Sequence, residues 1–349
     1  MKLRYRPIRL TCRTPFATAT GTTAARDSVL VAVEQDGCVG LGEAAPVRMY
    51  GQSCASVIAS LPAAAKILAA ADPFASEKMA DQLLAALPGQ FAAVAAIDMA
   101  VFDLAGKLAN QPTWRRLGVS ADNMPRTTFS IGIDSIERTG EKVREAAGWP
   151  VLKIKLGTEY DEAIIDAVRA ATGVPLRVDA NGGWSLARAR QMCRWLAERN
   201  VDLVEQPLPR GQEDDLRMLA AESPLPIFAD ESCHTAADAI GLAGCVHGVN
   251  LKLSKAGGIM ASLRLIHAAR AAGLKVMIGC MIESSIGIAA AAQLAPLCDV
   301  VDLDGHLLLA DDPAGGLACR DGKLVLSNRP GLGVELKAEL GDPRGWQSA

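Results

Sequence analysis

Two lysines separated by a single residue are the strongest chemical signal in this sequence. Lys153 and Lys155 lie within Val151–Gly157, where apolar residues flank and separate them. Alternation of this kind is typical of a β-strand, so both ammonium groups are expected on the same face. Two like charges on one face of a buried strand repel each other and are costly to desolvate. A solvated edge strand is the ordinary explanation, but residues further along the chain favour an anionic site beside the lysines.

Acidic residues end the next strand-like segments. Asp179, Glu205 and Asp230 each follow a short apolar run. On neighbouring parallel strands these carboxylates would converge on one arc and raise one another's pKa values. A hard divalent cation relieves that repulsion, and an oxygen-only ligand set fits Mg²⁺ or Mn²⁺ rather than zinc. A single acid at a strand end could instead cap the next helix, but charged residues recur at successive strand ends.

The other predicted strand ends also carry polar residues, namely Asn181, Asn250, Lys252, Glu283, Ser284, Asp302 and Asp304. In an eight-stranded barrel the second and sixth strands lie opposite each other, so Lys155 and Lys252 would face across the cavity. Asp302 and Asp304 would lie across from the metal. A ligand with its anionic end at the metal and a cationic end at the aspartates would place its middle carbon between the two lysines. This layout suits removal of a proton from one face of a carbon and its return to the other.

A repeated strand-then-helix pattern from about residue 126 would position these groups. Strands are predicted at Thr128–Gly132, Val151–Leu156, Leu176–Asp179, Asp202–Glu205, Pro226–Asp230, Gly248–Lys252, Lys275–Gly279 and Val300–Asp304. Helical spacing between most pairs favours a closed parallel barrel, with catalytic groups at the carboxyl ends of its strands. A doubly wound open sheet would need a switch point and a phosphate loop, and the sequence contains neither.

The first third of the chain has a different pattern. Ser28–Glu34 and Cys38–Glu43 predict a hairpin around Asp36-Gly37. Thr14–Thr23 reads as a small polar loop around Phe16 and Gly21. Ala-rich segments with helical spacing follow, which indicates an α+β unit.

The predicted domains are a capping unit at residues 1–118 and a barrel at residues 119–313. The tail, residues 314–349, is rich in Gly and Pro at its start and is expected to fold back onto the capping unit.

Composition limits the classes of function. Half of the 349 residues are hydrophobic, enough for a sizeable core, and the formal net charge of -3 gives no electrostatic case for nucleic acid or an anionic membrane surface. The nine cysteines are scattered without a metal-finger spacing, which suggests reduced thiols in a cytoplasmic protein. No apolar run reaches spanning length, and no signal peptide is expected. A homo-oligomer is left open.

Five ordered motifs resemble the enolase superfamily, in its muconate-lactonising (mandelate racemase/muconate cycloisomerase) branch. They are Lys153-Ile-Lys155, Asp179-Ala-Asn181, Val204-Glu205-Gln206-Pro207, Ala229-Asp230-Glu231-Ser232 and Asn250-Leu-Lys252. The resemblance implies a (β/α)₇β modified TIM barrel with an α+β capping domain. It also implies Mg²⁺ at Asp179, Glu205 and Asp230, acid/base roles for Lys155 and Lys252, and electrostatic support from Lys153. Asn181 and Asn250 would lie next to these residues, outside the direct contacts with metal and substrate, and hold them in position.

Within that branch, Asp302-Leu-Asp304 resembles the Asp-x-Asp of dipeptide epimerases, in which the pair binds the substrate's α-ammonium group. The resemblance implies an L-Ala-D/L-Glu epimerase-like activity, with Glu283, Ser284, Phe16 and Gly21 near the substrate. An N-acylamino acid racemase, an o-succinylbenzoate synthase, a muconate cycloisomerase and a non-catalytic binding protein remain alternatives.

Side-chain preference stays open. Members of the branch that select an acidic second residue tend to carry a cation in the first capping loop. Thr14–Thr23 has no lysine or arginine, and Arg26 is the nearest candidate.

Overall fold

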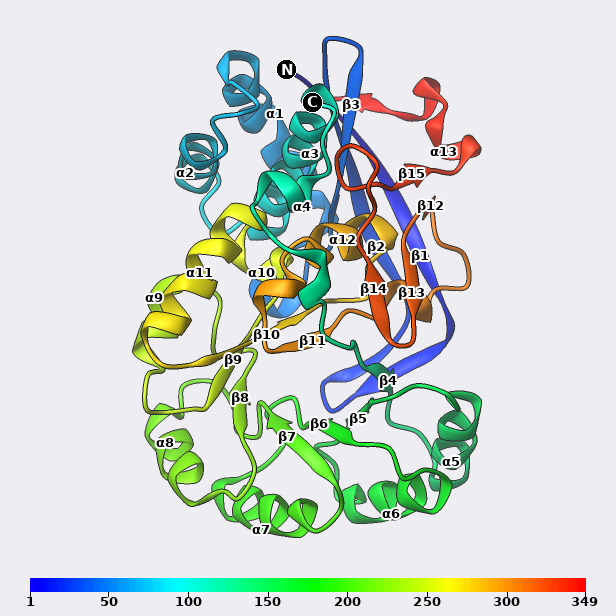
Figure 1. Cartoon of the computed structure of the whole chain (residues 1–349), viewed down its shortest axis with the longest axis vertical. Coiled ribbons are helices and arrows are strands. Elements are labelled where there is room, and N and C mark those ends of the chain that lie inside the picture. The colour runs from blue at the N-terminus through cyan, green and yellow to red at the C-terminus, as the bar shows by residue number, and fades with distance from the viewer.

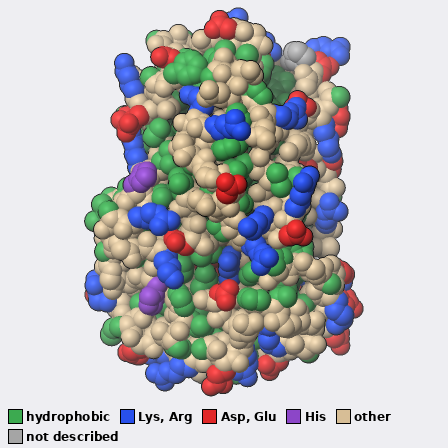
Figure 2. All heavy atoms as spheres, in the orientation of Figure 1, with side chains coloured by type: hydrophobic (Ala, Val, Ile, Leu, Met, Phe, Trp, Pro, Cys, Tyr) green, Lys and Arg blue, Asp and Glu red, His purple; other side chains and the backbone are tan. Residues whose placement is uncertain are grey.

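The computed structural model describes residues 1–349, apart from the side chain of Pro343. Two units are visible in Figure 1, an antiparallel sheet flanked by helices and an eight-stranded parallel barrel. Among the described residues, no helix combines the length and the apolar character needed to cross a membrane. Acidic and basic side chains are interspersed over the face shown in Figure 2.

The barrel strands are β4 (Phe129–Ile131), β5 (Leu152–Lys155), β6 (Leu176–Asp179), β7 (Val201–Glu205), β8 (Ile227–Ala229), β9 (Gly248–Leu251), β10 (Lys275–Gly279) and β11 (Val300–Asp302). They pair in parallel and in chain order, and a bridge between Thr127 and Val301 brings the first and last strands together. All eight strands predicted from the sequence are confirmed, with ends that agree within two residues.

The barrel helices are α5 (Ile136–Glu145), α6 (Asp161–Ala171), α7 (Leu186–Ala197), α8 (Glu213–Glu222), α9 (Ala236–Gly241), α10 (Leu253–Ala256), α11 (Ile259–Ala271) and α12 (Ser285–Ala292). Strand alternation divides the side chains of β5 between two environments. Leu152 and Ile154 belong to the main hydrophobic core, whereas Lys153 and Lys155 bond to carboxylates inside the barrel. The expectation that both lysines share one face is therefore confirmed.

The capping sheet has the strand order β16 (Gln347–Ser348), β1 (Lys2–Thr18), β2 (Gly21–Gln35) and β3 (Cys38–Ala44). Its helices are α1 (Cys54–Ala70), α2 (Ser76–Ala86), α3 (Phe91–Leu108) and α4 (Thr113–Arg116). The loop predicted at Thr14–Thr23 is wrong: this segment is the tip of the β1–β2 hairpin, with Phe16 opposite Thr23. Small polar residues resemble a loop, but pairing between the two strands extends them almost to the turn.

The tail contains β12 (Ala314–Gly315), β13 (Ala318–Arg320), β14 (Lys323–Val325), β15 (Glu335–Leu336) and α13 (Ala338–Gly341). Buried Asp103 of α3 fastens it to the cap. Its carboxylate accepts hydrogen bonds from the Leu332 amide at 2.7 Å, the Leu41 amide at 2.9 Å and Lys107 Nζ at 2.7 Å. The strand β16 also pairs with β1. The exact domain boundaries, at residues 118 and 313, stay a prediction.

A second buried carboxylate joins the cap to the barrel. Asp98 of α3 accepts hydrogen bonds from the first amides of α11, at 2.5 Å from Ile259 and 3.4 Å from Met260. The contact depends on Gly258, which has φ +107° and where an added Cβ would lie 2.5 Å from the Asp98 carboxylate. Asp98 therefore acts as an N-cap of α11, although it belongs to a different helix.

We expect Asp98→Ala to lower the free energy of unfolding by about 2 kcal/mol, because it removes a cap and leaves a buried amide without an acceptor. Asp98→Asn, which keeps an acceptor oxygen, is the matched control and should lose less. Urea unfolding followed by circular dichroism measures both. Equal midpoints for wild type and Asp98→Ala would show that the contact contributes nothing to stability.

Candidate active site

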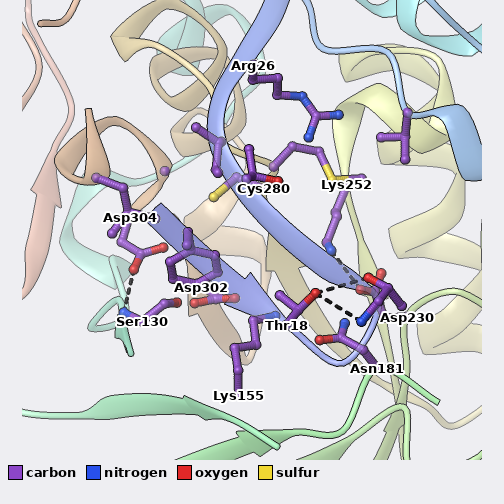
Figure 3. Close-up of a pocket in the computed structure, with 18 of the residues that line it drawn as sticks. Thr18, Arg26, Ser130, Lys155, Asn181, Asp230, Lys252, Cys280, Asp302 and Asp304 are labelled. Carbon is purple, nitrogen blue, oxygen red and sulfur yellow. Dashed lines mark hydrogen bonds and ion pairs between the residues drawn. The ribbon is translucent and has the colours of Figure 1, made fainter. Parts of the chain in front are cut away.

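A cavity of about 240 Å³ lies where the carboxyl ends of the barrel strands meet the capping hairpin. Figure 3 shows the side chains that point into it. The barrel contributes charged residues, among them Lys153, Lys155, Asp230, Lys252, Asp302 and Asp304. The cap contributes the opposite wall, which includes Phe16, Thr18, Thr20, Thr23, Arg26 and Tyr50. Chemistry-bearing groups and the groups that enclose them therefore come from different units.

Three buried carboxylates form the floor of the site. Asp179 and Glu205 end β6 and β7 and are register partners, and Asp230 follows β8. One oxygen from each lies within 4.8 Å of the others. Burial, and then the charge of Asp179, raise the pKa of Glu205 to about 7. Asn250 Nδ2 donates to Glu205 Oε1 at 2.7 Å, so Asn250 supports the cluster from behind, as expected.

This cluster fits a divalent cation. Every donor is an oxygen, all three side chains are buried, and their mutual repulsion would be relieved by a bound positive charge. Glu205 Oε2 makes no hydrogen bond within the described residues, although Lys153 Nζ lies 2.6 Å from it. A carboxylate oxygen that makes no hydrogen bond and faces two other carboxylates suits a ligand of Mg²⁺ or Mn²⁺.

The acid/base candidates approach the cluster from two sides. Lys155 Nζ lies 2.6 Å from Asp179 Oδ2, and Lys252 Nζ lies 2.6 Å from Asp230 Oδ2. Lys155 ends β5 and Lys252 follows β9, which is four positions away in the strand order. Figure 3 shows the two side chains entering the cavity from different walls. The geometry thus leaves a space between two amines, beside the carboxylate floor.

Lys153 lies at the centre of the charged network. Its Nζ is 2.6 Å from Glu205, 2.7 Å from Asp302 and 3.2 Å from Asp179. Burial acts to lower the pKa of Lys153, but the charges of Asp302 and Glu205 outweigh it and keep the pKa well above its usual value. Lys153 is therefore a permanent positive charge, suited to stabilising an anion rather than to moving a proton.

The two aspartates after β11 are not equivalent. Asp302 bonds to Lys153 and to the Thr128 hydroxyl, and although burial acts to raise its pKa, Lys153 lowers it to about 2. Asp304 accepts only from the Ser130 amide, at 2.5 Å, and no ion pair reaches it within the described residues. Burial and the charge of Asp302 raise the pKa of Asp304 to about 7. Asp304 is therefore the carboxyl group that still lacks a cationic partner.

Two charged residues of the site were missed at the level of sequence. Lys255 is fully buried, and its Nζ donates to both the main-chain oxygen and Oδ1 of Asp230 at 2.5 Å. Glu231 lines the cavity and accepts a hydrogen bond from Asn181 Nδ2 at 3.1 Å. The sequence contained a signal for each of them, because Lys255 follows Lys252 by three residues and Glu231 adjoins Asp230.

Three expected substrate contacts are not brought into the cavity lining. Gly21 lies at the turn of the hairpin and faces a neighbouring outer groove. The Ser284 hydroxyl bonds to buried Glu43 of β3. Glu283 turns back to accept a hydrogen bond from the Met281 amide at 3.1 Å. The bond between Ser284 and Glu43 joins the barrel to the cap, whereas Phe16 lines the cavity.

Comparison with known families covers nearly the whole chain. Residues 2–118 match the model described as the mandelate racemase / muconate lactonizing enzyme N-terminal domain, and residues 136–340 match the enolase C-terminal domain-like model.

Individual relatives are similar along most of their length. An L-Ala-D/L-Glu epimerase of Bacteroides thetaiotaomicron is 38% identical, with 96% of this chain and 88% of the relative aligned. An L-Ala-D/L-amino acid epimerase of Pedosphaera parvula is 42% identical over 97% of this chain and 100% of the relative. The crystal structure of an Enterococcus faecalis dipeptide epimerase complexed with Mg and L-Leu-L-Tyr superimposes with a TM-score of 0.91. It is 34% identical, and 96% of this chain and 99% of that chain are covered.

Proposed function

The chain belongs to the mandelate racemase/muconate lactonizing enzyme family, and on that premise we propose how its cavity works as that of a dipeptide epimerase. The reaction is a 1,1-proton transfer at the α-carbon of the C-terminal residue of a dipeptide. The observation that carries this proposal is the placement of Lys155 and Lys252 on two sides of the carboxylate cluster, in a cavity also lined by Asp304, which no ion pair reaches within the described residues.

Each end of a dipeptide meets a complementary charge. The substrate carboxylate would lie at the floor, within reach of Lys153, while the α-ammonium group would lie at Asp304, beside Asp302. One lysine Nζ takes the α-proton as the C–H bond breaks, and the other lysine gives a proton to the opposite face as the new C–H bond forms. Lys155 and Lys252 exchange base and acid roles according to the configuration of the substrate.

The α-proton next to a carboxylate is weakly acidic, because its loss builds a second negative charge on that group. Fixed positive charge lowers the barrier, and Lys153 provides it from its position between Glu205 and Asp302. Mg²⁺ or Mn²⁺ held by Asp179, Glu205 and Asp230 would supply further positive charge at the substrate carboxylate.

The alternatives on the same scaffold use substrates without a free ammonium group. N-acylamino acid racemase, o-succinylbenzoate synthase and muconate cycloisomerase substrates would leave the buried Asp304 carboxyl without a cation, which is costly. A non-catalytic binding protein would have no need for two amines facing one carbon.

Deuterium incorporation tests the proposal directly. A dipeptide library is incubated with the protein and Mg²⁺ in D₂O and read by mass spectrometry, with Lys155→Ala/Lys252→Ala protein as the control. We expect a gain of one mass unit in a subset of dipeptides and no gain in their N-acetylated counterparts. Exchange confined to the N-acetylated compounds would instead support an N-acylamino acid racemase.

Asp304 predicts a pH dependence. Its pKa is raised to about 7, so the free enzyme loses this negative charge as the pH falls through 7. We expect kcat/KM for a dipeptide to fall about tenfold per pH unit below that point, because a neutral carboxyl binds an ammonium group weakly. In Asp304→Asn this acid limb should disappear and kcat/KM at pH 8 should be ten- to a hundredfold lower. An unchanged limb in the variant would assign it to another group.

A further inference from the structure

The three carboxylates of the cluster share one pattern of contacts. One oxygen of each accepts a hydrogen bond from a donor that takes no part in the proposed proton transfer. These donors are the Asn181 amide, which reaches Asp179 Oδ1 at 2.9 Å, Asn250 Nδ2, which reaches Glu205 Oε1 at 2.7 Å, and Lys255 Nζ, which reaches Asp230 Oδ1 at 2.5 Å. The other oxygen of each carboxylate lies 2.6 Å from the Nζ of a cavity lysine, which is Lys155, Lys153 or Lys252 in the same order. Every carboxylate of the cluster thus has one anchored oxygen and one oxygen beside a cavity lysine.

Lys255 is the charged member of these three anchors. Its side chain is 1% exposed, and its Nζ also donates to the main-chain oxygens of Asp230 at 2.5 Å and of Cys233 and Asn250 at 3.0 Å. An ammonium group has three N–H donors, so these four protein oxygens use all of them. Lys255 therefore has no donor left for a substrate, and it is a positioning residue rather than an acid or base.

The same ammonium group joins two neighbouring strands of the barrel. Asp230 and Cys233 follow the end of β8, and Asn250 lies in β9, just before Lys252. Lys255 itself lies in α10, and its amide donates to the Lys252 carbonyl at 3.0 Å. A single turn of the chain therefore directs two lysines to the two oxygens of one carboxylate.

Asp230 needs a contact that does not depend on Lys252. In the proposed reaction Lys252 exchanges a proton with the α-carbon, so its Nζ has to turn from Asp230 Oδ2, to which it bonds in Figure 3, toward the substrate. A carboxylate fastened by that lysine alone would lose its orientation at each turnover. Lys255 can keep Oδ1 in place throughout, because it bonds only to protein oxygens.

We propose that Lys255 sets the affinity of the site for its divalent cation, by holding Asp230 so that one of its oxygens stays available beside Asp179 and Glu205. Two effects of this lysine oppose each other. Its charge repels a cation, whereas its hydrogen bonds orient a ligand that would otherwise have to be ordered when the cation binds. Orientation is the larger effect, because hydrogen-bonding partners of metal ligands typically contribute about 10–100-fold to metal affinity.

Lys255→Met separates the two effects, because methionine has a similar length but neither charge nor N–H donors. We expect titration calorimetry to give a Kd for Mn²⁺ that is about ten- to a hundredfold higher in the variant than in the wild type. A Kd equal to or lower than that of the wild type overturns the proposal, since loss of the charge alone would strengthen binding.

Two further variants guard against an effect of misfolding. Asp98→Ala weakens the cap of the neighbouring helix α11 without touching a carboxylate of the cluster, so it is the matched control and should keep the wild-type Kd. Lys255→Gln retains N–H donors for buried Asp230 on a shorter side chain, and its Kd should lie above that of the wild type and below that of Lys255→Met. If Lys255→Met does not fold, a wild-type Kd in Lys255→Gln overturns the proposal by itself.

Activity gives a second readout, which rests on the proposed function. The Mn²⁺ concentration that supports half of the maximal epimerisation rate should rise in Lys255→Met by the same factor as the Kd, and saturating Mn²⁺ should restore turnover. It should not restore turnover in Lys252→Ala, which lacks an acid/base group. A loss that saturating Mn²⁺ leaves uncorrected in Lys255→Met overturns a role in metal affinity. Failure of the wild type to turn over any dipeptide overturns the proposed function, while calorimetry still decides the role of Lys255.

Discussion

Lys155→Ala and Lys252→Ala should each lower the rate of epimerisation by at least about 10²–10⁴-fold, the range expected for loss of one general acid or base. The effect should be equally severe in both directions of the reaction, because each direction uses one lysine as base and the other as acid. Steady-state polarimetry with a single dipeptide measures it. The two variants should still bind a divalent cation, since neither side chain supplies a metal ligand.

Isotope exchange distinguishes two bases from one. In Lys155→Ala the remaining amine of Lys252 can still remove a proton from its own face and return solvent deuterium to that face. We therefore expect each variant to exchange the α-proton of one configuration only, without inversion, and the two variants to exchange opposite configurations. Lys275→Ala, at the other end of the barrel where β10 begins, is the control and should behave as wild type. Normal inversion by either active-site variant would refute the two-base mechanism.

Removal of the divalent cation should have an effect of similar size. Without the cation, the substrate carboxylate would approach three buried carboxylates whose charge is balanced only by the lysines of the site, and metal ions contribute several kcal/mol at such a centre. A loss of about 4 kcal/mol corresponds to roughly a thousandfold in rate. We expect chelation to reduce activity by that factor and Mg²⁺ or Mn²⁺ to restore it.

A binding measurement makes the metal prediction independent of turnover. Titration calorimetry should detect Mn²⁺ binding to the wild type and much weaker binding to Glu205→Gln, in which one charged ligand is neutral. Binding should also raise the thermal unfolding midpoint of the wild type, because a ligand that binds only the folded state stabilises it. Equal affinity in the two proteins would remove Glu205 from the ligand set.

The barrel could be predicted because the residues that mark each of its strands are close together in the sequence. A buried strand such as β8 is a short apolar run followed at once by a polar residue, Asp230, and that residue marks both the strand boundary and the active face. Asp179, Glu205 and Asp230 were recognised in this way, and the structure brings them together. The alternation in β5 likewise identified Lys153 and Lys155 as neighbours on one face.

Contacts between the cap and the barrel could not be predicted in that manner. Glu43 and Ser284 are 241 residues apart in the chain, and nothing local to either shows that they bond. Ser284 was therefore assigned to the substrate although its hydroxyl is already committed. The difference between Asp302 and Asp304 is also invisible in sequence, because it depends on which of them Lys153 reaches. The strand β1 was not predicted, although charged residues alternate with Leu3 and Tyr5 at its start.

Fastening of the cap by the tail has a consequence for the order of folding during synthesis. Asp103 accepts a hydrogen bond from the Leu332 amide, 229 residues further along the chain. Tyr5 donates to the side chain of Gln347, 342 residues away, so neither bond can form until the tail has been made. The capping unit leaves the ribosome first but is completed last. In the barrel, neighbouring strands follow one another in the chain, except where the first and last strands meet. A nascent chain without its tail would lack the strand that pairs with Arg4 and Tyr5 of β1, and an open sheet edge readily recruits other chains into aggregates.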